Sequence, residues 1–383
     1  MVPMKHESTA ASPNRLASLN ELGQSIWLDF IRRNLLGSEE FQLLLRRDLV
    51  MGVTSNPAIF EKAIASGDEY RGELQRQKAA CAADPKAVYE QLALADIRRA
   101  CALLQPTYAA TKRRDGYVSL EVSPKLAHDT AGTLEEARRL WGGVGAPNLM
   151  IKVPATAAGV PAIRTLISEG INVNVTLLFA DSAYRKVAEA YTAGLEELAV
   201  RGGDLSGVAS VASFFVSRVD SAIDPQLDEK AKDPAKRALA TKLRGKIAIA
   251  NAKLSYQSYA EWIATPRWKA LARKGAQTQR LLWASTGTKD AKYSDVLYVE
   301  ELIGRDTVNT VPPQTLDAFR DHGRPRESLA ENTEQWLGHL RELESLGISL
   351  DAATAKLLDE GVKLFDQAFD KLLAAVAAYG QAR

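Results

Sequence analysis

The sequence LMIKVP, at residues 149–154, is a short apolar run that contains a single charged side chain, Lys152. A run of this length and composition, between stretches with helical periodicity, is typical of a buried strand in a parallel sheet. Similar runs recur along the chain, and long helical stretches separate them. The runs are residues 25–30, 51–55, 116–122, 148–154, 171–176, 209–214, 281–285 and 306–311. Strands that alternate with helices in this way predict an α/β fold, a closed (β/α)8 TIM barrel, although the pattern also fits a doubly wound open sheet.

Length and composition narrow the possible classes of protein. The 383 residues allow two or three domains at roughly 150 residues each, or one barrel with insertions. Lys and Arg number 49 and Asp and Glu 47, so the net charge of +2 argues against nucleic-acid or anionic-membrane partners. The 46% hydrophobic and 25% charged fractions are typical of a globular protein, and no apolar run is long enough to span a membrane.

The barrel is expected to carry additional helices. Residues 1–18 are polar and lack the apolar segment of a secretory signal, so we expect a flexible N-terminal arm. No linker or second core follows, which predicts one barrel domain over residues 19–383. Helical insertions are expected near residues 57–110 and 230–276, with C-terminal helices at 331–379.

Three of these helices can be given approximate limits. Residues 86–108 and 234–262 have helical periodicity, and Pro266 is placed to open a further helix. Residues 351–379 have an apolar face, and we hypothesise that this helix packs across part of the barrel and borders its mouth.

Neither the cysteines nor the histidines predict a metal site. Cys81 and Cys101 are too few for a framework of several disulfides, and we expect both to be reduced thiols in a cytoplasmic protein. The four histidines show no paired ligand spacing. The sequence also lacks a Walker-type phosphate loop and a dinucleotide glycine fingerprint, so we expect a mechanism without metal or cofactor.

Polar residues fall near the ends of the predicted strands, where α/β barrels carry their chemistry. Lys152 lies in an almost entirely apolar run, and burial disfavours a charged ammonium relative to the neutral amine that can form a Schiff base. The alternative is a structural lysine that forms an ion pair or extends to solvent. Asp29 and Glu121 are single carboxylates in apolar runs and suit general acid or base roles, or else a buried ion pair with Lys152 or a helix cap at Asp29.

Amide and hydroxyl groups complete the candidate set at these strands. Asn56 precedes Pro57 and is first of all a candidate helix cap. Asn174 and Thr176 alternate with valines and share one side of their strand, where they can grip sugar hydroxyls or satisfy each other. Ser213 ends the sixth run.

A second group of residues suits a phosphate. Arg218 follows the sixth run, and the segment from Ser285 to Lys289 follows the seventh with hydroxyls, a glycine and a cation. Loops after the seventh and eighth strands of such barrels often bind phosphate, whereas an ordinary solvated turn is the simpler interpretation.

Two segments, GVTSNPAIF at residues 52–60 and LMIKVPATAAGV at residues 149–160, closely resemble the signature regions of the transaldolase family. The resemblance extends over residues 171–179, 213–220 and 282–310, and the long insertions resemble the larger bacterial form of the family. It implies a class I aldolase mechanism in the non-oxidative pentose phosphate pathway, with sugar phosphates as substrates.

The resemblance also implies roles for individual residues. Lys152 would form the Schiff base, Asp29 would be the acid and base for carbon–carbon cleavage, and Glu121 and Thr176 would work through a water. The residues that would bind substrate are Asn56, Asn174, Ser213, Phe215, Arg218, Ser285 and Lys289. Lys289 stands where the shorter transaldolases carry an arginine, a change that keeps a phosphate-binding charge but loses bidentate geometry.

Other functions remain open at this point. Fructose 6-phosphate aldolases of the same superfamily share the lysine but carry glutamine and tyrosine at the positions of Glu121 and Phe215, which favours the transferase here. A non-catalytic sugar-phosphate-binding barrel would not require a buried amine between two carboxylates. A scaffold built on the helical insertions is a third alternative. The oligomeric state and the preference among sugar phosphates are not predicted.

Overall fold

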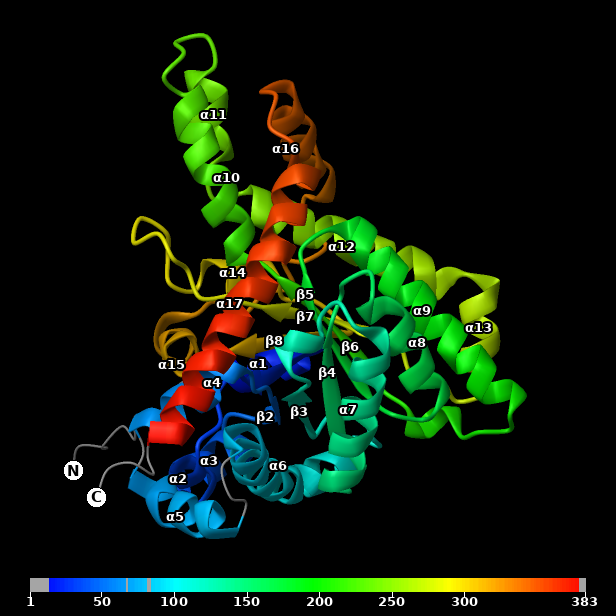
Figure 1. Cartoon of the computed structure of the whole chain (residues 1–383). Helices are drawn as coiled ribbons and strands as arrows, with labels where there is room; N and C mark the ends of the chain where they lie inside the picture. The colour runs from blue at the N-terminus through cyan, green and yellow to red at the C-terminus, as the bar shows by residue number, and fades with distance from the viewer. Residues whose placement is uncertain (1–13, 67, 81–83, 379–383) are drawn as a thin grey trace, which may run out of the picture.

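The computed structural model describes residues 14–66, 68–80 and 84–378, and its parallel strands close into a barrel in chain order (Figure 1). This closure confirms the predicted TIM barrel and rules out the open sheet. Each strand end differs from the predicted run by at most two residues. The strands are β1 (Gln24–Leu28), β2 (Val50–Val53), β3 (Tyr117–Glu121), β4 (Leu149–Pro154), β5 (Val173–Leu178), β6 (Ser210–Phe215), β7 (Arg280–Ala284) and β8 (Thr307–Val311).

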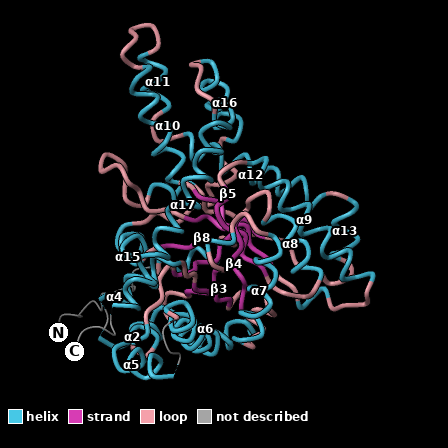
Figure 2. Tube along the Cα trace, viewed as in Figure 1, coloured by secondary structure: helices cyan, strands magenta, loops and turns pink. Residues whose placement is uncertain are grey.

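Helices surround the strands, which occupy the centre of the molecule (Figure 2). The α-helices of the described residues are α1 (Arg15–Glu21), α2 (Arg33–Leu36), α3 (Glu39–Arg46), α4 (Pro57–Ser66), α5 (Arg71–Ala80), α6 (Pro85–Ala110), α7 (Thr130–Val144), α8 (Gly159–Ser168), α9 (Asp181–Val200), α10 (Ser217–Lys230), α11 (Arg237–Leu243), α12 (Ile247–Ala264), α13 (Pro266–Ala272), α14 (Leu297–Glu301), α15 (Pro313–His322), α16 (Thr333–Ser345) and α17 (Leu350–Ala378). One hydrophobic cluster includes residues of the barrel, α6, α12 and α17.

Every second side chain of β1 points to the same side, so one row of residues extends from one end of the barrel to the other. Ser25, Trp27 and Asp29 are two residues apart and therefore point to the same side of the strand. Trp27 is fully buried and lies against Gly52, where an added Cβ would come within 2.5 Å of the indole ring. The glycine on β2 thus makes room for the tryptophan that separates Ser25 from Asp29.

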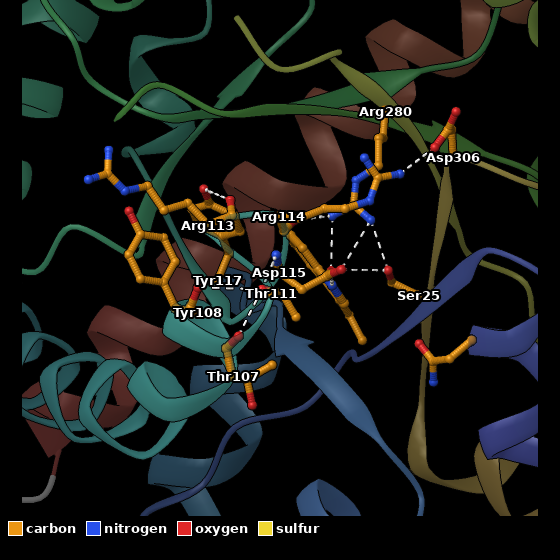
Figure 3. A network of polar contacts seen from close by, with 12 residues as sticks. Ser25, Thr107, Tyr108, Thr111, Arg113, Arg114, Asp115, Tyr117, Arg280 and Asp306 are labelled. Carbon is orange, nitrogen blue, oxygen red and sulfur yellow. Dashed lines mark hydrogen bonds and ion pairs between the residues drawn. The ribbon is translucent and has the colours of Figure 1, made fainter. Parts of the chain in front are cut away.

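A buried polar network closes the amino-terminal end of the barrel (Figure 3). Arg280, the first residue of β7, pairs with Asp115 at 2.9 Å, and their side chains are only 5% and 4% exposed. Asp115 also accepts hydrogen bonds from the Ser25 hydroxyl at 2.8 Å and the Trp27 indole nitrogen at 3.0 Å. Both charges are therefore compensated by close partners.

Two predicted segments need correction. Helix α1 begins at Arg15 and Leu16 is buried, so residues 15–18 belong to the folded body and not to the predicted arm. The remainder of that arm, residues 1–13, lies outside the described residues. The helix expected over residues 234–262 is two helices, α11 and α12, because Gly245 between them adopts a left-handed φ of +67° that ends a helical path.

Helix α17 crosses the barrel in Figure 1 and packs against α4, α6 and α10. Its Gly361 faces β5, where an added Cβ would lie 2.9 Å from the Leu177 side chain. The absence of a side chain at this position lets the helix approach the strand closely. The prediction that this helix packs across the barrel is confirmed.

Further predictions concern cysteines, metals and membranes. Cys101 is free and buried, and burial raises the pKa of its thiol to about 12, whereas Cys81 lies outside the described residues. Among the described residues, no group of three or more His, Cys, Asp or Glu side chains is placed to hold a metal ion. No helix in the same part of the chain is long and apolar enough to cross a membrane.

Candidate active site

A cavity of about 500 Å³ opens at the carboxyl ends of the strands. The residues around it come from β4, β6, β7 and β8, from the loops after β1, β2, β7 and β8, and from α4, α10, α15 and α17. Its walls include eight of the eleven predicted site residues, namely Asp29, Asn56, Lys152, Ser213, Phe215, Arg218, Ser285 and Lys289. The other three, Glu121, Asn174 and Thr176, are not among the residues that line it. Glu121 contacts the cavity residue Lys152, and Asn174 contacts the cavity residue Ser213.

Lys152 is buried near the end of β4, with 6% of its side chain exposed. Its Nζ donates a hydrogen bond to the Ser55 carbonyl oxygen at 3.2 Å and lies 3.6 Å from Oε2 of Glu121. The second distance is too long for a hydrogen bond but joins the two groups as a buried ion pair, one of the predicted alternatives, whereas extension of Lys152 to solvent is wrong. The amine faces a cavity with hydrogen-bonding capacity still available.

Two carboxyl groups flank this amine. Glu121 on β3 is the register partner of Lys152 on β4, and Asp29 follows β1. Burial raises the pKa of Glu121 to about 7, although the positive charge of Lys152 opposes the shift. Burial also raises the pKa of Asp29 above its ordinary value, against the opposing effects of Lys152 and a hydrogen bond from Thr54. Carboxyl groups with raised pKa values can exchange protons near neutral pH.

Hydroxyl groups orient Asp29. The Thr54 hydroxyl donates to Oδ1 of Asp29 at 2.6 Å and lies 2.7 Å from the Thr310 hydroxyl. Neither threonine was among the predicted site residues. Thr54 precedes Asn56 by two positions, so the alternation that marked Asn174 and Thr176 was also present here and offered a signal.

Asn174 and Thr176 differ in their hydrogen bonding. Asn174 donates to the Ser119 hydroxyl at 2.9 Å and accepts from the Ser213 hydroxyl at 2.6 Å. The hydroxyl of Thr176 and Oε2 of Glu121 are buried without a hydrogen-bond partner in the described residues. The alternative in which Asn174 and Thr176 satisfy each other is therefore wrong, and two buried polar atoms are available to a water or a substrate.

Two cations occupy the part of the cavity formed after β6 and β7. Arg218 on α10 stacks over the Phe215 ring at 5.2 Å, and burial lowers the pKa of its guanidinium. Lys289 is exposed in the loop after Ser285. Within the described ranges no carboxylate forms an ion pair with Arg218 or Lys289, so both charges are available to an anion.

Ser217 and Ser285 contact each other through both their side chains and their backbones. Ser285 has a left-handed φ of +55°, and its hydroxyl lies 2.9 Å from the Ser217 hydroxyl. The Ser217 backbone nitrogen donates to the Ser285 carbonyl at 3.0 Å. These bonds join the start of α10, which carries Arg218, to the beginning of the loop after β7, which carries Lys289.

Asn56 caps helix α4, as its position before Pro57 predicted, since its side chain accepts a hydrogen bond from the Ile59 backbone nitrogen at 3.0 Å. It also lines the cavity. The cap thus fixes the orientation of an amide whose remaining donor atoms can reach a ligand.

Phe365 was not predicted as a site residue. It lies on α17, 5.9 Å from Nζ of Lys152 measured to the ring centroid, and it lines the cavity. A phenylalanine on an apolar helix face has no sequence feature that distinguishes it from other core residues. Its position depends on how α17 packs across the barrel.

The site combines a buried amine, two carboxyl groups whose pKa values are raised by burial, and two cations that have no ion-pair partner among the described residues. This arrangement suits covalent chemistry on the carbonyl of a substrate that also carries an anionic group.

Comparisons with known proteins agree with this chemistry. Residues 26–376 match the family model described as transaldolase/fructose-6-phosphate aldolase. The chain is 48% identical over 363 residues to a protein named transaldolase from Thiobacillus denitrificans, which covers 95% of this chain and 99% of the relative. It is 47% identical over 366 residues to a transaldolase from Trichodesmium erythraeum, with 94% and 96% covered. A transaldolase from Thermobifida fusca is 47% identical over 363 residues, with 94% and 97% covered.

Proposed function

Since the chain belongs to the transaldolase/fructose-6-phosphate aldolase family and is a transferase of the transaldolase type, we propose that it transfers a dihydroxyacetone unit through a Schiff base on Lys152. The donor is a ketose phosphate, sedoheptulose 7-phosphate or fructose 6-phosphate. The acceptor is an aldose phosphate, glyceraldehyde 3-phosphate or erythrose 4-phosphate. The membership places the reaction in the non-oxidative pentose phosphate pathway.

Imine formation is the first step of the proposed mechanism. The neutral amine of Lys152 attacks the ketone carbon, and the resulting carbinolamine loses its hydroxyl group as water. Glu121, whose pKa is raised to about 7, supplies the proton through a water that Thr176 also binds. The two buried polar atoms without partners support this water-mediated role, because each requires a hydrogen-bonding neighbour.

Carbon–carbon cleavage follows. Asp29 removes the proton of the C4 hydroxyl, the C3–C4 bond breaks, and its electron pair passes into the protonated imine to give an enamine. The aldose phosphate leaves with a C4 carbonyl. An incoming aldose phosphate is then attacked by the enamine carbon, Asp29 returns the proton to the new hydroxyl, and hydrolysis of the imine releases the product ketose.

The remaining residues bind the two ends of the substrate. Asn56, Asn174 and Ser213 hold the hydroxyls of the dihydroxyacetone part, and Phe215 packs beside them. Arg218, Ser285 and Lys289 bind the phosphate, a role supported by two cations without acidic partners. A lysine supplies the charge but not the fork geometry of an arginine.

The observation that carries the proposal is the buried amine of Lys152 beside Glu121 and Asp29. Incubation with fructose 6-phosphate followed by borohydride reduction is expected to leave a three-carbon adduct on the peptide that contains Lys152. Lys152→Ala is expected to form no adduct. Lys253 serves as an internal control, because it is also buried but binds the Ser328 carbonyl oxygen outside the cavity. An unmodified Lys152 peptide in a folded protein would overturn the Schiff-base mechanism and favour a non-catalytic sugar-phosphate-binding barrel.

An experiment with the acceptor substrate distinguishes a transaldolase from a fructose 6-phosphate aldolase. Erythrose 4-phosphate added before reduction is expected to discharge the adduct as sedoheptulose 7-phosphate. Release of free dihydroxyacetone at the same rate with and without acceptor would favour the aldolase. Glu121 and Phe215, where the aldolases carry glutamine and tyrosine, support transfer.

The proposal includes cellular location and partners. Phosphorylated sugars are charged and do not cross lipid bilayers freely, so we place the enzyme in the cytoplasm with its substrates. No nucleic-acid or membrane partner is proposed, and the oligomeric state is left open.

A further inference from the structure

We propose that Arg244, between α11 and α12, is a positioning residue for the phosphate end of the substrate, because it holds Asp290 away from the neighbouring Lys289. The inference rests on the proposed function for the identity of the substrate, but phosphate binding itself can be measured without catalysis. It gives the second helical insertion a role in the site.

Lys289 lies between two cavities. One is the candidate active site of about 500 Å³, and the other is an adjacent cavity of about 320 Å³. The walls of the second cavity are strongly acidic, with Arg244 and Lys289 as its basic residues. Its carboxylates are Asp220, Asp224, Asp228 and Asp290. The side chain of Lys289 can therefore serve a substrate phosphate on one side or protein carboxylates on the other.

Asp290 is the strongest competitor because it is adjacent to Lys289 in the chain. Neighbouring basic and acidic residues do pair in this protein, since Arg47 and Asp48 are joined by two contacts of 2.8 Å. Asp290 does not pair in this way. Its Oδ1 accepts the Lys292 backbone nitrogen at 2.9 Å, and its Oδ2 accepts Nη2 of Arg244 at 3.1 Å.

Arg244 thus compensates the charge that would otherwise act on Lys289. Its guanidinium also pairs with Asp228 through the other terminal nitrogen, and only 20% of the side chain is exposed. One arginine therefore pairs with two carboxylates of the acidic cavity. Lys289 itself forms no ion pair within the described residues, so its ammonium is available to an incoming anion.

Two hydrogen bonds attach the segment after β7, which includes the loop with Lys289 and helix α14, to helix α10. Tyr293 donates to Asp224 at 2.6 Å, and Tyr298 donates to Asp220 at 2.9 Å. The two aspartates are four residues apart and so lie on one face of α10. Since α10 begins with Ser217 and carries Arg218, the same helix connects both phosphate-binding cations.

The helix break beside Arg244 is part of this arrangement. Gly245 has a left-handed φ, and its backbone nitrogen donates to Asp224 at 3.2 Å. A Cβ added at Gly245 would lie 2.8 Å from the Tyr293 ring. The absence of a side chain lets the chain turn closely over Tyr293 and brings Arg244 to Asp290.

The test measures the affinity of Arg244→Gln for inorganic phosphate by calorimetry and its kinetics with fructose 6-phosphate and erythrose 4-phosphate. We expect the phosphate dissociation constant and KM for fructose 6-phosphate to rise roughly tenfold, because Asp290 becomes free to pair with Lys289, whereas kcat stays within about twofold. Arg267→Gln is the matched control, since Arg267 also bridges two carboxylates, Glu189 and Glu196, but lines neither cavity.

The double variant Arg244→Gln, Asp290→Asn separates charge competition from loss of structure. Removal of the competing carboxylate is expected to restore phosphate affinity to within about threefold of the parent, a rescue that a merely structural role would not give. Unchanged phosphate affinity in Arg244→Gln, or a double variant no better than the single one, would overturn the inference. Failure of the proposed function would be seen separately, as the absence of an adduct on Lys152 in the parent protein.

Discussion

The two ends of the barrel bury opposite charges in different ways. At the amino-terminal end, Arg280 and Asp115 lie 2.9 Å apart, and the Ser25 hydroxyl adds a hydrogen bond (Figure 3). The Trp27 indole nitrogen adds another. At the carboxyl end, Lys152 lies 3.6 Å from a Glu121 oxygen that has no hydrogen-bond partner in the described residues. Burial is similar at the two ends, because all four side chains are at most 6% exposed.

The difference separates structural from functional charge. A buried ion pair is stable only when hydrogen bonds satisfy its remaining donors and acceptors, and the Arg280 network meets this requirement. The charges around Lys152 are less completely satisfied, so a ligand or water can complete the set. The degree of hydrogen bonding, and not burial alone, therefore indicates which end carries the chemistry.

The largest expected effect is a loss of activity when Lys152, at the carboxyl end of the barrel, is replaced. Lys152→Met is expected to lower kcat by about 10⁴-fold or more, because the covalent intermediate cannot form. The thermal midpoint should stay close to that of the parent, because Glu121, whose pKa burial raises to about 7, can bind a proton when its partner Lys152 is replaced by an apolar chain of similar length. Activity assays and thermal unfolding test this, and a strongly destabilised variant would place Lys152 among the structural charges.

The opposite result is expected at the other end. Arg280→Met should lower the free energy of unfolding by roughly 3–5 kcal/mol, because Asp115 is left buried without its cation. kcat per folded molecule should be unchanged. Arg280→Met combined with Asp115→Leu provides the control, and denaturant unfolding should find it more stable than the single variant. If the single variant unfolds like the parent, the network has no structural role.

Phe365 tests whether α17 contributes to the mouth. Phe365→Ala removes the ring that covers Lys152 and should lower kcat/KM by roughly tenfold, because water gains access to the amine. Leu364→Ala is the matched control, since Leu364 is its neighbour but 52% exposed, whereas Phe365 is 7% exposed. Equal kcat/KM values for the two variants would contradict a role of Phe365 in the site.

The smallest effect is a change of stability with pH. Burial raises the pKa of Glu121 from 4.5 to about 7, so the folded state binds a proton more tightly than the unfolded state. The stability that this proton contributes is fully present below the unfolded pKa and is lost as pH rises through the folded pKa.

Glu121→Gln keeps a neutral side chain at every pH. The thermal midpoint of the variant should therefore be close to that of the parent at about pH 5 and higher than that of the parent at about pH 8. Thermal unfolding at both pH values measures the difference. The same midpoint difference at the two pH values would show that Glu121 does not titrate in this window.

The strands and several site residues at their ends were predictable from local sequence. The apolar runs located all eight strands because strand residues alternate in facing direction and are flanked by helical periodicity. The same rule placed Asp29, Lys152 and Ser213 at strand ends, and the structure brings them to one cavity. The roles of these residues stay predictions until the adduct experiment is done.

Other features depended on contacts between segments distant in sequence. Phe365 reaches Lys152 from a helix more than two hundred positions later, and Arg244 reaches Asp290 only because the chain turns at Gly245. The helix break was missed because a single glycine inside an apolar helical pattern is often tolerated.

Local patterns thus determined the eight strands, the helices between them and the side of each strand that faces the site, because these follow from the periodicity of neighbouring residues. The tertiary structure decided the strand order and the closure of the barrel, since the same pattern also fits an open sheet. Tertiary packing decided which buried charges are satisfied, which helix covers the amine and which arginine compensates the carboxylate beside Lys289. Those outcomes depend on distances between atoms that chain connectivity does not constrain, so they emerged only when the barrel closed and its helices packed around it.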